Sequence, residues 1–300
     1  MNKPLKYGLF LVTSITFVIF IVCVLFRFIN DEFSFLILLV ISLISAIIIS
    51  FLIILTAPLL KDILATYRTM MRLENLSHPL LIELSLEAPG TYNHSLIVAN
   101  LANRAAKSIG ANSILTRIGG YYHDIGKSKN AELFIENQTL GENPHIEINS
   151  PAKSAKIIMD HVSDGVKMAE ANHLPKEIID LIEQHHGTTA ISFFYQQAKD
   201  KNYKTKKEDF RYPGPKPLTP EAVILMLSDA IEAKIRLSNK VTPLVIRETV
   251  DEIINMRIKD RQFELSPVDN AKMARIRESF IETLSTMYHH RVKYPAGTHK

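Results

Sequence analysis

Two long apolar runs dominate the first part of the chain. Residues 8–26 and residues 33–60 contain no charged side chain, and only the short link 27–32 separates them. A helix needs about 20 apolar residues to cross a bilayer, and each run approaches or exceeds that length. Both runs are apolar on every side of a helix rather than along one stripe, unlike soluble core helices. The pattern therefore predicts a transmembrane helical hairpin in residues 1–60.

The charged residues that flank the two runs indicate how the hairpin is oriented. Lys3 and Lys6 precede the first run, and Lys61, Arg68 and Arg72 follow the second. Because cytoplasmic flanks carry an excess of lysine and arginine, both ends of the hairpin and the soluble part are predicted to be cytoplasmic, as in a multi-pass protein of the cell membrane. A cleaved signal peptide is the alternative for the first run, but the run is long for one and no small-x-small site follows it.

The polar remainder of the chain has the spacing of helices and no clean strand alternation. Residues 61–86 are predicted to form a juxtamembrane helix whose apolar stripe packs on the same chain or on a second copy in a homodimer. The segment 87–91 breaks that helix, and residues 87–300 are predicted to fold as one all-α domain. Within it the lysine- and proline-rich residues 199–217 are predicted to be a long loop. Proline, glycine and capping residues predict a short helix before His123 and helices over residues 92–109, 151–171, 175–186, 220–237, 243–258 and 267–290.

Composition narrows the partners without identifying a function. The formal net charge of +4 is too small to indicate DNA binding, and the lysines beside the apolar runs suit a lipid bilayer with anionic headgroups. The single cysteine, Cys23, lies inside the first apolar run. This excludes a disulfide within the chain and a cysteine-based zinc site, so the chemistry must come from other side chains.

Candidate metal ligands recur in five segments of the predicted helical domain. All are histidine or aspartate: His94, His123, Asp124, His161, His185, His186 and Asp229. Imidazole and carboxylate ligands together suit Fe, Mn, Co or Ni. Seven ligands exceed what one tetrahedral ion takes, and they fit two octahedral ions that share a bridging carboxylate and a bridging hydroxide. Since such paired ions catalyse displacement at phosphorus, the pattern predicts a metal-dependent phosphohydrolase.

Each of these residues also has an ordinary explanation when it is taken singly. A histidine on a helix is usually a surface residue or a hydrogen-bonded core residue. Asp229 lies in an apolar stretch, where it suits either a metal or a hydrogen-bonded core position. The ordered combination of all seven favours the metal. The remaining histidines fall outside that combination and receive no ligand role: His78, His145, His173, His289, His290 and His299.

Six stretches of sequence carry a resemblance to a known family. They are EAPGTYNHS (87–95), GYYHDIGK (120–127), FIENQ (134–138), HHGTT (185–189), FRYPGPKP (210–217) and SDAIEA (228–233). Together they resemble the HD-domain metal-dependent phosphohydrolases, and among these the seven-transmembrane, PgpH-type cyclic di-AMP phosphodiesterases. No Gly-Tyr-Pro follows the HHGTT stretch, which disfavours the HD-GYP branch. The chain departs from the PgpH type in its two predicted membrane helices, with no large extracytoplasmic domain, and in Ile146, where an acid is expected.

The resemblance implies a fold, a site and a reaction. The fold is a helical HD-domain bundle with two divalent transition-metal ions, Fe or Mn. The reaction is hydrolysis of cyclic di-AMP to linear pApA, or to AMP if cleavage continues. By the same resemblance, the core metal ligands are His94, His123, Asp124 and Asp229, and a second metal position is completed by His161, His185 and His186.

Three further residues are candidates for contact with substrate. Lys127 lies one turn past Asp124, where it is placed to hold a phosphate, and it is assigned a catalytic role together with His123 and Asp124. Its alternative is a solvated helix lysine. Arg211 and Tyr212 in the FRYPGPKP loop are candidates to grip a second phosphate or to stack on a base.

Two other functions remain compatible with the metal ligands. The first is an HD phosphohydrolase that acts on another nucleotide, on cyclic di-GMP or on RNA ends. The second is a membrane sensor that binds a cyclic dinucleotide without cleaving it and signals through residues 61–86. The seven ligands argue against the sensor, because binding alone does not require them.

Overall fold

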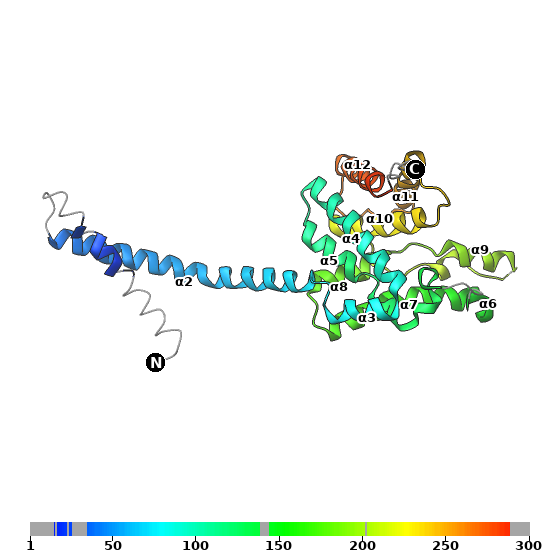
Figure 1. Ribbon diagram of the computed structural model, residues 1–300, viewed down its shortest axis with the longest axis horizontal. Coiled ribbons are helices and arrows are strands. Elements are labelled where there is room, and N and C mark those ends of the chain that lie inside the picture. Colours follow the sequence, from blue (N-terminus) through cyan, green and yellow to red (C-terminus); the bar gives the residue numbers. More distant parts are fainter. Residues whose placement is uncertain are drawn as a thin grey trace, which may run out of the picture. The chain divides into compact units, whose positions relative to one another are not determined.

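A computed structural model describes residues 15, 17–22, 24–25, 35–138, 144–201 and 203–288 of the chain (Figure 1). The chain divides into two compact units, residues 1–71 and residues 72–300. In the described ranges every regular element is a helix, and the only β pairing is an isolated bridge between Ala190 and Arg211. The prediction of an all-α fold is confirmed.

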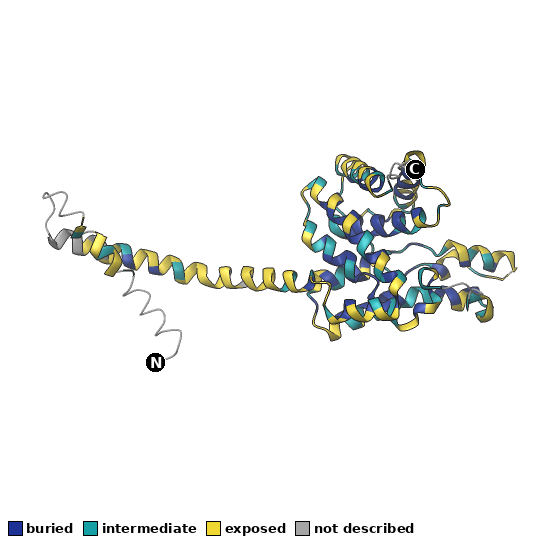
Figure 2. Ribbon diagram, viewed as in Figure 1, coloured by how far each residue is buried: buried dark blue, intermediate teal, exposed yellow. Residues whose placement is uncertain are grey.

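The long helix α2 (Phe35–Leu73) makes up most of what is described of the first unit. Its segment Leu43–Leu73 reaches a mean hydropathy of 2.7 and has the length and composition needed to cross a membrane. Apolar side chains are exposed along it, such as Phe51 at 65% and Leu55 at 63% (Figure 2). Among the described residues it is the one candidate membrane span. The first helix of the predicted hairpin, residues 8–26, and the link 27–32 lie largely outside the described residues.

The prediction of one continuous juxtamembrane helix over residues 61–86 is wrong, because the helix is interrupted in its middle. Helix α2 ends at Leu73, a turn follows, and a separate helix α3 (Pro79–Glu87) begins. His78 is extended, with φ −64° and ψ 137°, because the residue before a proline is driven out of the helical region. The His78 side chain accepts a hydrogen bond from the Leu80 backbone N–H and so caps α3.

The second unit is a bundle of helices of unequal length. Figure 1 shows α10, α11 and α12 together on one side of this unit and α3, α6 and α7 on the other, with α4 between them. After α3 its elements are α4 (Pro89–Ile109), α5 (Ser113–Tyr122), η1 (Ile125–Leu133), η2 (Ile135–Asn137), α6 (Pro144–Ile148), α7 (Pro151–Ala171), α8 (Lys176–Gln184), α9 (Ser192–Asp200), η3 (Lys207–Phe210), α10 (Pro220–Arg236), α11 (Pro243–Lys259) and α12 (Asn270–Met287).

Local capping signals account for most of the helix boundaries. Ser150, Thr219 and Thr242 each stand before a proline and accept a backbone N–H three residues ahead, at the starts of α7, α10 and α11. Gly110 ends α4 in the left-handed region at φ 72°, which glycine adopts without a steric cost. Helix α12 starts three residues later than predicted because Asp269 provides its cap.

The core of the second unit lies between α4 and α10. Leu101 and Ala102 of α4 pack with Ile224 and Leu227 of α10, and Phe280 of α12 closes the same cluster. Helix α10 is buried without interruption over residues 222–229. A helix enclosed in this way carries Asp229 into an apolar interior, which fixes the position of that carboxylate.

The predicted long loop over residues 199–217 is more ordered than expected. Helix α9, which the sequence analysis missed, enters its first residues, and the 3-10 turn η3 lies in its middle. Phe210 is 1% exposed and packs with Ala155, Phe194 and Ala198. This buried ring anchors the loop against α7 and α9, because an apolar side chain of that size stabilises whatever backbone carries it into the core.

Gly120 marks the tightest approach of α5 to α4 and tests this packing. A Cβ atom at Gly120 would lie 2.5 Å from the Ala99 Cα atom, so we expect Gly120→Ala to lower the free energy of unfolding by about 1–3 kcal/mol. Gly119→Ala is the matched control, because the closest approach of its Cβ would be to Cδ1 of the Leu181 side chain, which can move, and not to backbone. Chemical denaturation of the two variants measures the difference. Equal stability would show that the α4–α5 contact is less rigid than the structure indicates.

Candidate metal centre

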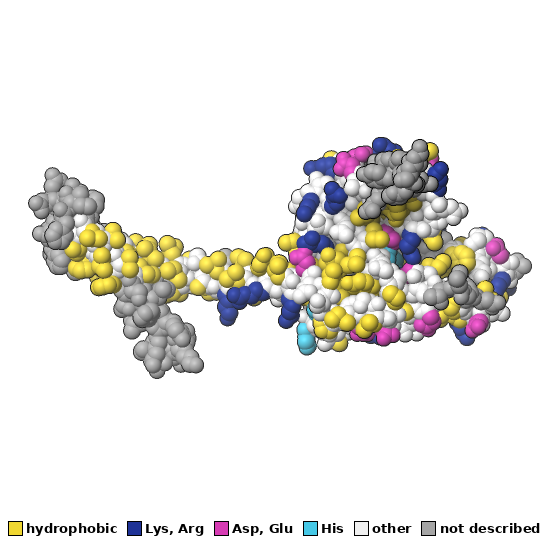
Figure 3. Space-filling view, in the orientation of Figure 1, with side chains coloured by type: hydrophobic (Ala, Val, Ile, Leu, Met, Phe, Trp, Pro, Cys, Tyr) yellow, Lys and Arg dark blue, Asp and Glu magenta, His cyan; other side chains and the backbone are white. Residues whose placement is uncertain are grey.

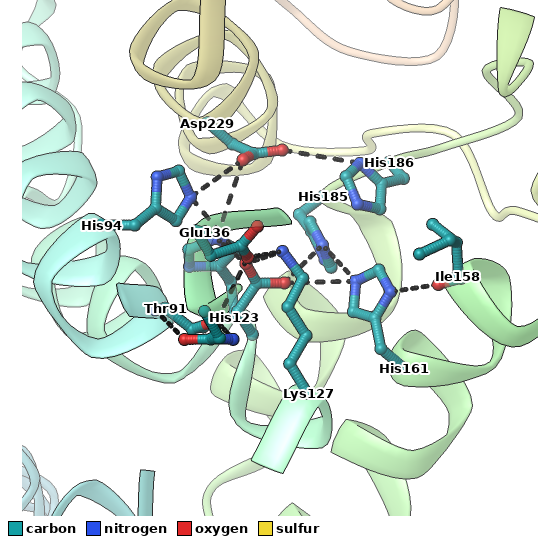
Figure 4. A network of polar contacts seen from close by, with 12 residues as sticks. Thr91, His94, His123, Lys127, Glu136, Ile158, His161, His185, His186 and Asp229 are labelled. Carbon is teal, nitrogen blue, oxygen red and sulfur yellow. Dashed lines mark hydrogen bonds and ion pairs between the residues drawn. The ribbon is translucent and has the colours of Figure 1, made fainter. Parts of the chain in front are cut away.

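All seven predicted ligands come together in the second unit, from helices far apart in the sequence (Figure 4). His94 lies on α4, His161 on α7 and Asp229 on α10, while the other ligands lie at the C-terminal ends of α5 and α8. In each of two groups the ligand atoms lie within 4.8 Å of one another, and Asp124 belongs to both. The first group consists of His94, His123, Asp124 and Asp229. The second consists of Asp124, His161, His185 and His186.

The environment of Asp124 suits a bound cation. This residue is fully buried, and neither of its carboxylate oxygens has a hydrogen bond of good geometry among the described residues. Histidine Nε2 atoms surround it: those of His123 and His161 lie 3.2 Å from its oxygens, that of His185 3.7 Å and that of His94 3.8 Å. Buried polar atoms are normally satisfied. Imidazole nitrogens and carboxylate oxygens that converge in this way fit a divalent ion.

The backbone orients three of the histidine rings. The Nδ1 atoms of His123, His161 and His185 lie 2.8, 2.5 and 2.6 Å from the carbonyl oxygens three residues earlier. When Nδ1–H donates to a carbonyl, Nε2 is left as the acceptor and faces the metal position. Each ring is thus held by its own helix turn in the tautomer that a metal requires.

Gly126 allows Asp124 and His161 to approach each other. A Cβ atom at Gly126 would lie 2.0 Å from the His161 carbonyl oxygen and 2.5 Å from the Gly165 backbone nitrogen. A side chain therefore cannot stand there. The GYYHDIGK stretch carries glycine at this point because η1 and α7 touch through their backbones.

Burial and neighbouring charges set the charge states of the cluster. Burial opposes ionisation of Asp124, but His123 and Lys127 hold the pKa of its carboxyl well below the usual range. Burial lowers the pKa of His185 to about 3. Burial opposes protonation of His94 too, yet its hydrogen bonds with Asp229 and Glu232 raise its pKa to about 10. The cluster thus combines ionised carboxylates with a neutral imidazole at His185.

The structure places Lys127 in the centre rather than in solvent. Its Nζ atom lies 2.7 Å from Asp124 Oδ2 and 2.9 Å from Glu136 Oε1, and its side chain is 13% exposed. Burial opposes its charge, but Asp124 and Glu136 raise the pKa of the ammonium group. A fixed cation therefore stands beside the carboxylate that both ligand groups share.

Tyr212 also lies at the cluster. Its ring is 4.3 Å from that of His186, centroid to centroid, at an interplanar angle of 30°, and it meets His161 edge-on at 6.1 Å. The residue is 8% exposed, and burial raises the pKa of its hydroxyl. Since His186 covers one face of the ring, that face is not free to stack on a base.

The structure does not bring Arg211 into the cluster. Its Nη1 and Nη2 atoms donate to both carboxylate oxygens of Asp260, at 3.0 and 2.7 Å, and Nη1 also donates to the Thr188 carbonyl oxygen at 2.6 Å. Bidentate pairing of this kind occupies the guanidinium fork. Arg211 thereby fixes the HHGTT segment that follows the ligands of α8.

Two buried acids that the sequence analysis did not single out support the cluster. Glu232, which is 1% exposed, accepts a hydrogen bond from Nδ1 of His94. Glu136 contacts Lys127, and Thr91 Oγ1 donates to it at 3.1 Å. Arg236 lies between them, 3.7 Å from Glu232 and 3.9 Å from Glu136. Both acids lie in family-like motifs, Glu232 in SDAIEA and Glu136 in FIENQ, and this position is the sequence feature that could have identified them.

The histidines without an assigned role lie apart from both ligand groups wherever they are described. His145 Nε2 lies 2.9 Å from the Leu133 carbonyl oxygen, and its ring packs edge-on against Phe194. His173 has a positive φ of 55° at the end of α7. Ile146, where an acid is expected, is 64% exposed on α6. His289, His290 and His299 lie outside the described residues.

The face of the second unit seen in Figure 3 is hollowed, with histidine surface in the hollow beside acidic and basic side chains. Histidine side chains are therefore accessible to solvent on this face. His186, at 18% side-chain exposure, is the most accessible ligand in the ion pairs of the cluster.

Comparisons with known proteins agree with this geometry. The family model described as the HD domain matches residues 91–234. Cyclic-di-AMP phosphodiesterase PgpH of Listeria monocytogenes is 45% identical over 232 residues, which cover 77% of this chain and 32% of that protein. PgpH of Bacillus subtilis is 42% identical over 238 residues, covering 79% and 33%. The chain thus spans about a third of the length of these curated relatives.

A solved structure has the same fold. The crystal structure of the L. monocytogenes PgpH HD domain in complex with cyclic-di-AMP superposes with a TM-score of 0.69 at 45% identity. The match covers 72% of this chain and 100% of that one. The similarity therefore extends over the whole of that domain.

The shared position of Asp124 makes metal content a direct test. We expect the purified full-length chain to hold about two ions, Asp124→Ala to lose both, and His185→Ala to keep about one, because only one group contains His185. Elemental analysis after dialysis against Mn²⁺ measures this, with His173→Ala as the control. Equal losses in Asp124→Ala and His185→Ala, with helical content retained, would contradict the division into two groups.

The contact between Glu232 and His94 predicts a second effect on metal binding. Glu232→Gln keeps the size of the side chain but removes its charge, so we expect the affinity for Mn²⁺ to fall by roughly tenfold or more. Competition with a chelator measures the affinity, and Glu248→Gln, an exposed position on α11, is the control. Unchanged affinity would mean that the acid only fills space beside His94.

Proposed function

Because this chain belongs to the HD-domain family, we propose that it is a metal-dependent phosphodiesterase that hydrolyses cyclic di-AMP at the histidine–aspartate cluster. The observation that carries this proposal is the pair of ligand groups that share the buried Asp124. The similarity to a PgpH HD domain whose structure is known with cyclic-di-AMP supports the choice of substrate.

Two divalent ions would be held at the cluster, one by each ligand group, and Asp124 would serve as a ligand in both groups. Fe and Mn suit this mixture of imidazole and carboxylate. When bound, such ions supply a Lewis acid for the phosphoryl oxygens and make water nucleophilic at neutral pH. The remaining tasks fall to the side chains of the chain itself.

Lys127 provides positive charge where the phosphoryl group must bind. Its ammonium group has three N–H donors, two of which face Asp124 and Glu136. The third is available for a phosphoryl oxygen. Glu136 holds the side chain in place, so this donor is oriented before the substrate arrives and little ordering accompanies the reaction.

The hydrogen bonds to the histidine rings keep the ligands rigid during turnover. Carbonyl oxygens hold His123, His161 and His185, and Glu232 holds His94. Tyr212 packs against His186 and excludes water from that side of the ring. A site held this firmly favours one alignment of nucleophile and leaving group.

The products follow from the chemistry of the ring. Water adds to one phosphorus, the bond from that phosphorus to the 3′-oxygen breaks, and the leaving oxygen takes up a proton. A single cleavage opens the ring to linear pApA, and cleavage of the second diester gives AMP.

The placement of the activity at a membrane is part of the proposal. Helix α2 has the composition of a membrane span, and we propose that it pairs with residues 8–26 as a hairpin in the cell membrane. Lys61, Arg68 and Arg72 then mark the cytoplasmic flank, as the positive-inside rule requires. The catalytic unit would act on a cytoplasmic nucleotide.

A hydrolysis assay tests the proposed function. We expect the full-length chain in detergent with Mn²⁺ to convert cyclic di-AMP to pApA, and we expect the variant with both His123→Ala and Asp124→Ala to fall to background, because it loses ligands from both groups. Chromatography of the products measures this, and His173→Ala is the control. Full activity in the double variant would refute the metal site. Cleavage of cyclic di-GMP with no cleavage of cyclic di-AMP would refute only the substrate.

A further inference from the structure

The last turn of α11 carries an arginine, Arg257, that has no ion pair in the part of the chain that the structure describes. Its Nε atom is buried and makes no hydrogen bond there. Its Nη1 atom lies 3.9 Å from the sulfur of Met256. A guanidinium group has five donors, and a buried donor without a partner, here the Nε–H, is costly. An arginine in this state is suited to an anion that comes from outside the chain.

This turn of α11 is fixed against the segment that carries two of the metal ligands. The Gln262 backbone N–H donates to the Arg257 carbonyl oxygen at 3.0 Å. Gln262 Oε1 in turn accepts the Thr188 backbone N–H at 3.0 Å, and Thr188 follows His186 by two residues. A Cβ atom at Gly187 would lie 2.5 Å from the same Oε1 atom. The backbone of Arg257 is therefore held close to the ligand segment through Gln262.

The charges around Arg257 leave it unneutralised. Asp229, Asp260 and Tyr212 lie within its electrostatic range. Asp260 already pairs through both oxygens with Arg211, and Asp229 faces His94 and His186. Burial lowers the pKa of Arg257, although these three groups oppose the change. An arginine remains charged under any such shift, so this positive charge has no ion-pair partner among the described residues.

We propose that Arg257 binds the phosphate of the dinucleotide that is not being hydrolysed. This inference rests on the proposed function, since a cyclic dinucleotide carries two phosphates and only one can lie at the metal cluster beside Lys127. Arginine suits the second, because its planar fork binds phosphate through two hydrogen bonds. Arg211, the residue that the sequence suggested for this task, has its fork occupied by Asp260.

An alternative role for Arg257 is purely structural. A cation in the last turn of a helix stabilises the helix dipole, and Arg257 and Lys259 both lie there. That role predicts a loss of stability when Arg257 is replaced and no preference among substrates. A phosphate-binding role predicts weaker binding of a substrate with two phosphates and no effect on a substrate with one.

The test compares Arg257→Met and Arg257→Lys in the full-length chain with Mn²⁺. For cyclic di-AMP we expect Arg257→Met to raise KM roughly 10- to 100-fold with kcat little changed, and Arg257→Lys to give an intermediate value. For bis(p-nitrophenyl) phosphate, which has one phosphate, kcat/KM should change less than about twofold. The Kd of a phosphorothioate analogue of cyclic di-AMP should rise by the same factor as KM. Arg247→Met, an exposed cation on the same helix, is the control.

The outcomes separate this inference from the proposed function. An unchanged KM for cyclic di-AMP, or an equal loss on both substrates, would overturn the role of Arg257 alone. If Arg257→Met lowers the melting temperature, the KM of Arg257→Lys decides, because that variant keeps the charge at the end of the helix. A wild-type chain that cleaves the one-phosphate diester but neither binds nor cleaves cyclic di-AMP would overturn the proposed function, and the assignment of Arg257 with it.

Discussion

The structure of the second unit depends on one constraint, the burial of an ionised carboxylate at Asp124. A buried charge is tolerated only when other charges and hydrogen bonds compensate it. Here four helices, α4, α5, α7 and α8, bring histidine nitrogens towards that carboxylate, and the Lys127 ammonium group lies 2.7 Å from it. The apolar core between α4 and α10 makes this possible, because it holds His94 and Asp229 at a fixed separation. The packing that stabilises the fold therefore also positions the residues of the site.

The seven residues that converge in the two groups could be predicted from the sequence, whereas the residues that support them could not. Histidine and aspartate in one order form a pattern that few other constraints produce. Glu232 and Glu136 lack such a pattern, because an acid on a helix is usually a surface residue. The contact between His94 and Glu232 spans 138 positions of sequence. Only the packing of α10 on α4 reveals it.

Helix boundaries were likewise predictable where local residues set them and not where tertiary packing did. Capping at Thr219 and Thr242 and the left-handed Gly110 are local, so the sequence predicts those ends well. The break at His78 is also local, but the apolar stripe through residues 61–86 hid it. Helix α9 is short and depends on Phe194 and Phe210 packing together, which is a tertiary effect. Two arginines show the same contrast. Arg211, in the conspicuous FRYPGPKP motif, pairs with Asp260 and has a structural role. Arg257, in an ordinary helix turn, has no ion pair among the described residues.

The two ways of orienting the histidine rings have a consequence for folding. His123, His161 and His185 are each fixed by a carbonyl oxygen three residues earlier, so these rings can take their final orientation as soon as their own helix turns form. His94 cannot, because the group that fixes it belongs to α10. The metal centre is then assembled in two stages. The His161 and His185 side can form from local structure, while the side with His94 and Asp229 waits for long-range docking, which is the slower event.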